Sequence, residues 1–107
     1  VQDVLRNLPL IKGLVHVTGG GFYENIPRVL PTGLGVQIDL CSWEVPPIFK
    51  LLKRLGDLSQ RDMYTTFNMG IGMIAVVNKG DAGSLLENIS GAVIIGSVTS
   101  QEGVVLR

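Results

Sequence analysis

Cysteine and histidine are almost absent from this sequence of 107 residues, which contains one of each, Cys41 and His16. A lone cysteine cannot form an internal disulfide or a cysteine zinc site, so disulfide scaffolds and zinc modules are excluded. The single histidine lies beside no motif serine, so no catalytic triad can be proposed. Glu24 has no metal-ligand spacing with any other carboxylate. The sequence therefore predicts no metal site of its own.

The chain also lacks an excess of charge of one sign and any long hydrophobic run. Nine basic and nine acidic side chains give a net charge of zero, so no basic stripe is available for a phosphate backbone and nucleic-acid binding is not expected. No run approaches about 18 uncharged apolar residues, and the N-terminus lacks the features of a signal peptide. We therefore expect no membrane span and a cytoplasmic location.

Charged residues are scarce as well, at 17% against about 25% in typical soluble domains. So few charges cannot coat a whole surface, and we expect part of the outside to be covered by further chain or by a partner subunit. What is abundant is glycine, with 14 residues. The length suits one domain of about 100 to 150 residues and excludes two.

Apolar spacing predicts strands that alternate with helices. Strands are expected at residues 14–18, 36–40 and 71–77, the last as a central strand covered on both faces, and residues 92–98 and 104–106 are expected to form a terminal hairpin. The expected fold is α/β (α+β), a mixed sheet with covering helices.

Helical spacing is present in several of the intervening segments. A helix over residues 22–30 must either kink at Pro27 or begin near Asn25, because proline lacks an amide hydrogen. The other helices are expected at residues 1–8, where a cut helix would indicate a truncated domain, at residues 46–56, at residues 59–67 with a capping box from Ser59 to Asp62, and at residues 81–89 with Asp81 as the cap.

The densest group of chemical side chains is HVTGGGFYENIPRVLP, residues 16–31. Glycines let backbone amides approach a ligand, and the following helix start presents unpaired amides to an anion. Arg28 adds a fork of donors suited to a phosphate, and Asn25 can donate or accept. On a strand His16 and Thr18 project from the same side.

Each of these residues also has a purely structural interpretation. Gly19, Gly20 and Gly21 can form a tight turn between strand and helix, since the pattern is neither a Walker loop nor GxGxxG. His16 can be a partly buried strand residue. Asn25 can cap the helix, and Arg28 can be a surface charge or pair with Glu24.

A second group is FNMGIGM, residues 67–73, where Asn68 precedes Gly70 and Gly72. Small residues there admit either a substrate or a closely packed helix, and the residues alone favour neither. Trp43 is expected to anchor the chain between strand and helix to the core, and Cys41 to be a small buried residue.

Three motifs in this order, residues 16–31, SWEVPPIFKLL (residues 42–52) and MYTTFNMGIGM (residues 63–73), resemble the C-terminal domain of the aminoimidazole ribonucleotide synthetase family, also called phosphoribosylformylglycinamidine cyclo-ligases. The likeness covers residues 13–98, and IIGSV (residues 94–98) looks like the family's terminal strand. The resemblance implies an α/β/α domain related partly to ferredoxin-like folds, with residues 1–107 as its later part.

The activity implied by the resemblance is a step of de novo purine synthesis. Such enzymes use ATP and Mg²⁺ to close the imidazole ring of formylglycinamidine ribonucleotide, which gives aminoimidazole ribonucleotide, ADP and phosphate. The formyl amide oxygen is activated by phosphoryl transfer, and the amidine-side nitrogen then attacks as phosphate leaves.

The resemblance also implies roles for matching residues. His16 is the candidate for proton transfer or substrate orientation. The substrate or phosphate side of the cleft would be lined by Thr18, Gly19, Gly20, Gly21, Asn25 and Arg28, with Asn68 and Gly70 nearby.

The family's N-terminal domain, which supplies most ATP and Mg²⁺ binding and the homodimer interface, is expected to be missing, together with an S-N-G turn earlier in the C-terminal domain. The chain alone is therefore expected to be inactive. The alternatives are a sister ATP-using enzyme such as selenophosphate synthetase or the amidotransferase of the preceding step, a non-catalytic ligand-binding or regulatory module, and an oligomerisation domain.

Overall fold

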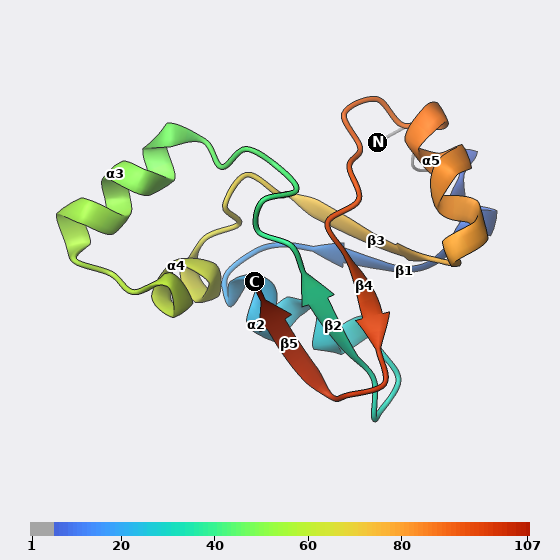
Figure 1. Ribbon diagram of the computed structural model, residues 1–107, viewed down its shortest axis with the longest axis horizontal. Helices are drawn as coiled ribbons and strands as arrows, with labels where there is room; N and C mark the ends of the chain where they lie inside the picture. Colours follow the sequence, from blue (N-terminus) through green and yellow to red (C-terminus); the bar gives the residue numbers. More distant parts are fainter. Residues whose placement is uncertain (1–5) are drawn as a thin grey trace.

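The computed structural model describes residues 6–107 as five strands, four α-helices and three short 3₁₀ helices, arranged as two small sheets with helices packed around them (Figure 1). Most of the helix expected at residues 1–8 lies outside this range. The first complete element is the 3₁₀ helix η1, Leu8–Leu10. The radius of gyration is 14.1 Å. The α/β fold class predicted from the sequence is confirmed.

The first sheet has two strands. β1 (Ile11–His16) pairs antiparallel with β3 (Met73–Val77), with His16 opposite Met73 at one end. The prediction that β3 is a central strand covered on both faces is wrong, because β1 is its only neighbour among the described residues and Met73 is 49% exposed. A continuous apolar run does not reveal how many neighbours a strand has.

The second sheet has the order β4-β2-β5, formed by Gly96–Thr99, Gly35–Ile38 and Gly103–Leu106. The prediction of a terminal hairpin is wrong, because β4 and β5 lie on opposite sides of β2, antiparallel and parallel to it respectively. The connection between them passes the start of β2, where a Cβ on Gly35 would collide with the carbonyl oxygens of Gln101 and Gly103. Only glycine allows the chain to cross there.

The helical segment after β1 is interrupted at its proline, as the kink alternative requires. α2 (Gly21–Asn25) ends before Pro27, and the 3₁₀ helix η2 (Pro27–Val29) continues the turn. Pro27 has no amide hydrogen to extend α2, and its carbonyl accepts the Leu30 amide at 3.2 Å, as in a 3₁₀ turn.

The remaining helices follow the predicted spacing closely. α3 (Pro47–Gly56) begins with proline at its first position, and the capping box at the start of α4 (Gln60–Thr66) is confirmed, with Asp62 amide to Ser59 Oγ and Ser59 amide to Asp62 Oδ2 both at 3.1 Å. η3 (Lys79–Asp81) leads into α5 (Ala82–Asn88). Asp81 stands at the cap position of α5, but its side chain makes no capping hydrogen bond.

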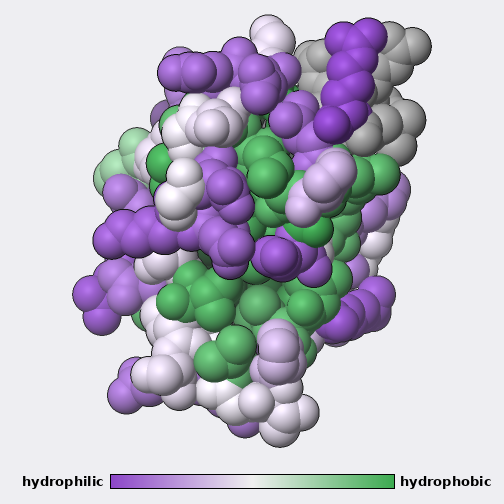
Figure 2. All heavy atoms as spheres, turned by 90° about the vertical axis from the view of Figure 1, so that its right-hand side faces the viewer, coloured by the Kyte–Doolittle hydropathy of each residue, from purple (hydrophilic) through white to green (hydrophobic). Residues whose placement is uncertain are grey.

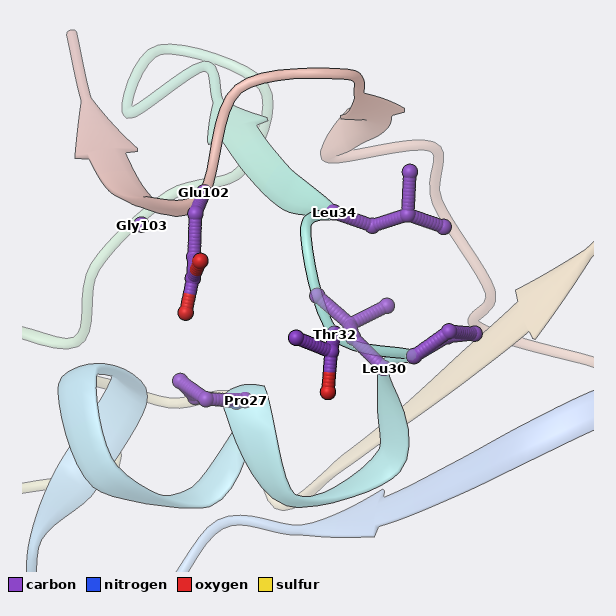
Figure 3. Close-up of a pocket in the computed structure, with 7 residues that line it drawn as sticks. Pro27, Leu30, Thr32, Leu34, Glu102 and Gly103 are labelled. Atoms are coloured by element: carbon purple, nitrogen blue, oxygen red, sulfur yellow. The ribbon is translucent and has the colours of Figure 1, made fainter.

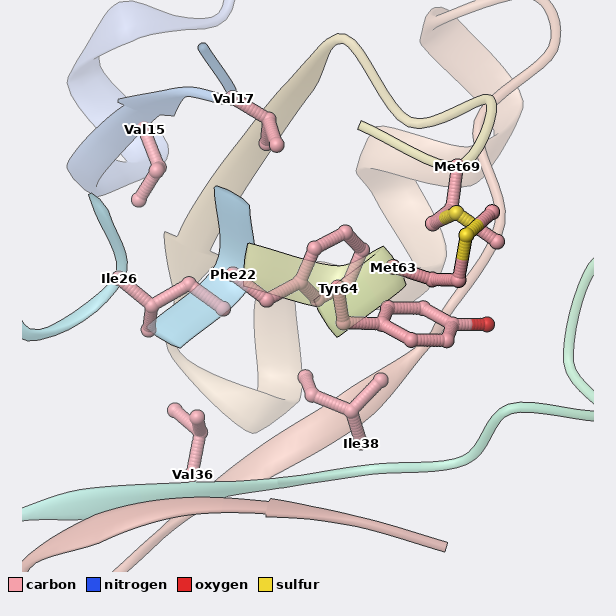
Figure 4. Close-up of a cluster of buried hydrophobic side chains, with 9 residues drawn as sticks. All are labelled: Val15, Val17, Phe22, Ile26, Val36, Ile38, Met63, Tyr64 and Met69. Atoms are coloured by element: carbon pink, nitrogen blue, oxygen red, sulfur yellow. The ribbon is translucent and has the colours of Figure 1, made fainter. Parts of the chain in front are cut away.

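The core lies between the two sheets, α2 and α4 (Figure 4). Phe22, Ile26 and Met63 are fully buried at its centre, and the ring of Phe22 meets Tyr64 edge to face with centroids 5.3 Å apart. The other buried hydrophobic members are Val15, Val17, Val36, Ile38 and Met69. Because Phe22 directly follows the three glycines, the core fixes where that turn is presented.

Several hydrophobic side chains remain at the surface. α3 projects from the body in Figure 1, and of its apolar face Ile48, Leu51 and Leu55 are exposed. Figure 2 shows a further hydrophobic area, broken by hydrophilic side chains, on the side that carries α5. The free Cys41 is exposed rather than buried as expected. No helix within residues 6–107 has the length and apolar character needed to cross a bilayer.

Candidate functional site

The glycine turn, residues 18–21, connects β1 to α2. Beyond the last strand residue the Val17 amide still donates to the Gly72 carbonyl at 3.0 Å, so pairing with the chain before β3 extends up to the turn. The chain then reverses with φ of 94° at Gly20 and 58° at Gly21, and the Gly21 amide donates to the Thr18 carbonyl at 2.9 Å. These left-handed angles explain why glycine stands at both positions.

Close packing is a second reason why two of the three positions are occupied by glycine. A Cβ on Gly21 would collide with the Tyr64 carbonyl of α4, and one on Gly20 would collide with the Glu24 carboxylate, whereas a Cβ on Gly19 would meet nothing within 4 Å. Within residues 6–107 the amides of Gly19 and Gly20 have no hydrogen-bond acceptor. The turn thus has one amide that is bonded internally, that of Gly21, and two that have no internal acceptor among the described residues.

Asn25 holds this turn together. Its side chain is 4% exposed, and Nδ2 donates to the carbonyl oxygens of Gly21 at 2.7 Å, Thr18 at 3.2 Å and Gly19 at 3.4 Å. Its Oδ1 accepts from Arg28 at 3.3 Å. Asn25 does not cap η2, the helix that begins at Pro27, because the N-cap position there is Ile26 and no side chain makes a capping hydrogen bond. Its amide hydrogens are bonded to the carbonyl oxygens of the glycine turn, so its observed role is to stabilise that turn.

A cavity of about 250 Å³ lies beside the turn and brings four of the predicted site residues together. His16 and Thr18 are both exposed and both line it, so the expectation that they project from the same side is confirmed. Arg28 reaches the cavity from η2 and makes no ion pair with Glu24. The complete lining is Leu14, Val15, His16, Thr18, Asn25, Arg28 and Val29.

The charge around this cavity favours an anion. Arg28 contributes a permanent positive charge, and no carboxylate is among the lining residues. The apolar residues Leu14, Val15 and Val29 were not identified as site residues from the sequence, because they carry no chemical signal beyond the alternation of a strand. They form the apolar part of the wall next to the polar groups.

The Asn68 turn, residues 68–70, lies outside that cavity lining. Asn68 Oδ1 accepts from the Gly70 amide at 2.9 Å, so the carboxamide oxygen closes its own turn. Gly70 has φ of 94°, and a Cβ there would lie 2.6 Å from Cδ of Pro46. The Val17 to Gly72 hydrogen bond joins the residue before the glycine turn to a residue just after the Asn68 turn, so the two turns are close in space. Neither Asn68 nor Gly70 is among the residues that line the cavity.

Tyr64 of α4 packs against the glycine turn at Gly21, and its side chain is uncharged. Burial raises the pKa of Tyr64 above its usual value of 10.0, and the nearby Tyr23 adds a smaller effect in the same direction. Tyr64 therefore stays neutral at physiological pH and brings no negative charge to the site.

A second hollow of about 240 Å³ lies beside η2, between it and the connection from β4 to β5 (Figure 3). Its wall is mainly apolar, with Pro27 on one side and the Glu102 carboxylate on the other. A carboxylate repels a phosphate, so of these two hollows the one lined by His16 and Arg28 fits an anionic ligand better.

The described residues do not provide a metal centre. Residues 6–107 contain no group of three or more His, Cys, Asp or Glu side chains placed to hold a metal ion. The Mg²⁺ implied by the resemblance does not fit this part of the chain, and no chemical step is assigned here to a metal.

Comparison with known proteins gives relatives that carry the name phosphoribosylformylglycinamidine cyclo-ligase. The chain is 47% identical over 108 residues to the phosphoribosylformylglycinamidine cyclo-ligase of Thermoanaerobacter sp. (strain X514), covering 97% of this chain and 32% of the relative. It is 55% identical over 96 residues to the enzyme of that name from Acetivibrio thermocellus, covering 86% of this chain and 28% of the relative. The chain therefore spans about a third of the length of these relatives.

The solved structures agree on the fold. The chain superposes on the crystal structure of E. coli HypE, a hydrogenase maturation protein, with a TM-score of 0.70 and 23% identity, over 98% of this chain and 34% of HypE. At that identity the likeness concerns the fold alone. All of residues 1–107 match the family described as AIR synthase related protein, C-terminal domain. The chain belongs to this family of AIR synthase related C-terminal domains.

Proposed function

We propose that this chain is the C-terminal domain of a phosphoribosylformylglycinamidine cyclo-ligase, and that its cavity binds the phosphate end of formylglycinamidine ribonucleotide. The observation that carries the proposal is the meeting of Arg28, His16 and Thr18 around one cavity without a carboxylate. Family membership and relatives at about 50% identity support the reaction class.

In the cavity, Arg28 donates to the phosphate oxygens and balances their charge, and Thr18 adds a hydroxyl donor. Gly19 and Gly20 are not among the residues that line the cavity, and their amides donate to the ligand from the adjacent turn. Asn25 keeps Arg28 and the turn in one geometry. His16 orients the substrate or carries a proton at an imidazole nitrogen, since it is the one histidine of the chain.

The overall reaction closes the imidazole ring. Phosphoryl transfer from ATP converts the formyl amide oxygen into a phosphate leaving group, and the amidine-side nitrogen forms the new C–N bond as that phosphate departs. We assign none of the phosphoryl transfer to this chain. We propose that ATP and Mg²⁺ are bound mainly by an N-terminal domain that also forms a homodimer, because the relatives are about three times as long as the matched segment.

The binding role of Arg28 is tested by Arg28→Ala. Anchoring of the phosphate predicts that affinity for formylglycinamidine ribonucleotide falls by about 1.5 to 3 kcal/mol, measured by titration calorimetry. Arg54→Ala is the matched control, because Arg54 is an exposed arginine in the last turn of α3, away from the cavity. A loss below about 0.5 kcal/mol for Arg28→Ala would remove this residue from the site.

The reaction itself is tested with a chimera. This chain replaces the matched segment of the Thermoanaerobacter relative, and ATP-dependent formation of aminoimidazole ribonucleotide is followed. We expect activity from the chimera and none from residues 1–107 alone. Turnover by the chain alone would contradict the proposed division between domains. A folded chimera that binds the ribonucleotide without converting it would indicate a non-catalytic binding module instead.

A further inference from the structure

Trp43 contacts the backbone of the Asn68 turn and the residue that follows the glycine turn. It belongs to the connection between β2 and α3. Its ring stacks on Phe22, with centroids 5.9 Å apart and an angle of 14° between the planes, and Phe22 directly follows the glycine turn. Its indole Nε1 donates to the Met69 carbonyl at 3.1 Å, in the middle of the Asn68 turn. One side chain thus contacts the Asn68 turn directly and the residue that follows the glycine turn.

The turn that Trp43 holds is strained. Met69 has φ of 55°, a left-handed conformation that is unfavourable for a residue with a Cβ, and its side chain is 6% exposed. Such backbone persists only where the surroundings enforce it. Here the enforcing contacts are the indole hydrogen bond to Met69, the Asn68 side chain bonded to the Gly70 amide, and the ring of Pro46 packed beside Gly70.

This strained turn is connected to the cavity through the backbone. Ile71, whose amide donates to the Asn68 carbonyl at 2.9 Å, leads to Gly72, whose carbonyl accepts the Val17 amide. Val17 lies between His16 and Thr18, the two residues that line the cavity from the end of β1. The Asn68 turn is therefore connected by short-range backbone hydrogen bonds to the segment that carries both side chains.

We propose that Trp43 is a positioning residue, whose indole hydrogen bond locks the strained Asn68 turn against the glycine turn and thereby sets the places of His16 and Thr18. The benefit of this positioning for ligand binding rests on the proposed function. The effect of Trp43 on the structure of the two turns does not depend on it. If Trp43 only filled space in the core, any aromatic ring of suitable size would serve as well. The proposal instead requires the N–H group.

The test uses Trp43→Phe, which retains a ring to stack on Phe22 and removes the donor. Amide hydrogen exchange is measured by NMR on the chain. We expect exchange at Gly70 and Ile71 to accelerate by about tenfold or more beyond the change at core amides. Ile38→Val, in the buried strand β2, is the control for a general loss of stability. Equal acceleration at all amides in Trp43→Phe, as in this control, would overturn the proposal.

A measurement on the unmodified chain covers the case in which Trp43→Phe does not fold. The proposal predicts that the Trp43 indole hydrogen exchanges as slowly as the Gly70 amide, because both belong to one locked unit. Exchange at the rate of an unprotected indole would contradict it. In the chimera, Trp43→Phe is expected to lower kcat/KM about tenfold while Ile38→Val changes it less than about twofold. An inactive chimera would count against the proposed function, whereas the exchange rates still decide the role of Trp43.

Discussion

Single side chains in this structure take on roles that their chemical type leaves open. Asn25 is able to cap a helix, bind a ligand or brace a turn, and its three carbonyl contacts within the glycine turn select the last of these. Ser59 and Asp62 form the reciprocal pair that their spacing predicts. The Ser59 pair lies within one helical turn, whereas the Asn25 contacts depend on how the glycine turn closes, since they reach back as far as Thr18.

At the residue scale we predict that acid weakens the start of α4. The Ser59 backbone amide, and secondarily the Ser59 side chain, lower the pKa of Asp62 below its ordinary value of 3.8. A carboxyl group with a lowered folded pKa stabilises the fold above its unfolded pKa, and this contribution is lost as pH falls through the folded value. Carboxyl titration by NMR is expected to place the Asp62 midpoint below 3.8 and to show Ser59→Ala raising it only part of the way toward 3.8, because the backbone amide of residue 59 remains as a donor. An Asp62 midpoint at or above 3.8 in the unmodified chain would exclude the capping box as a cause of a lowered pKa.

At the scale of elements, close approach of backbones decides where glycine is required. α2 begins against the carbonyl of Tyr64 in α4, and the connection from β4 to β5 crosses the first residue of β2. Gly21 and Gly35 stand at these two crossings. By contrast Gly19 meets no neighbour, although it stands in the same run of three glycines.

We predict that Gly21→Ala destabilises the chain by at least about 2 kcal/mol, because alanine meets both a left-handed backbone and the Tyr64 carbonyl. Gly19→Ala, the matched control in the same turn, is expected to change the free energy of unfolding by less than about 0.5 kcal/mol. Urea denaturation of the two variants measures both values. Equal losses would mean that contact with α4 does not govern the turn.

For the whole molecule, burial is uneven. The described residues place a small core between two sheets, centred on Phe22, Ile26 and Met63. Of the apolar residues of α3, Ile48, Leu51 and Leu55 are exposed, with Leu55 at 74%. We expected from the low charge content that further chain or a partner subunit covers part of the surface, and this stays a prediction.

We predict that Phe22→Ala costs about 3 to 5 kcal/mol of unfolding free energy, since it opens a cavity in the centre of the core. Leu55→Ala is expected to cost less than about 0.5 kcal/mol, because this side chain already meets solvent in the chain. Thermal and denaturant unfolding of both variants provide the measurement. A large loss for Leu55→Ala would show that the α3 face is covered in solution, by a second copy of the chain or by another partner.

The sequence by itself determined the features that depend on neighbours a few residues apart. The capping box, the break at Pro27, the start of α3 at its prolines and the shared side of His16 and Thr18 follow from backbone periodicity and local hydrogen bonding. The three motifs were also enough to identify the family.

Tertiary structure alone decided which strands pair and which polar groups are available. The insertion of β2 between β4 and β5, the open side of β3, the bracing role of Asn25 and the place of Trp43 between two turns all depend on segments distant in sequence. Such contacts form through burial and close packing of the whole chain, and hydrophobic burial is non-directional, so a local pattern of residues does not specify its partner.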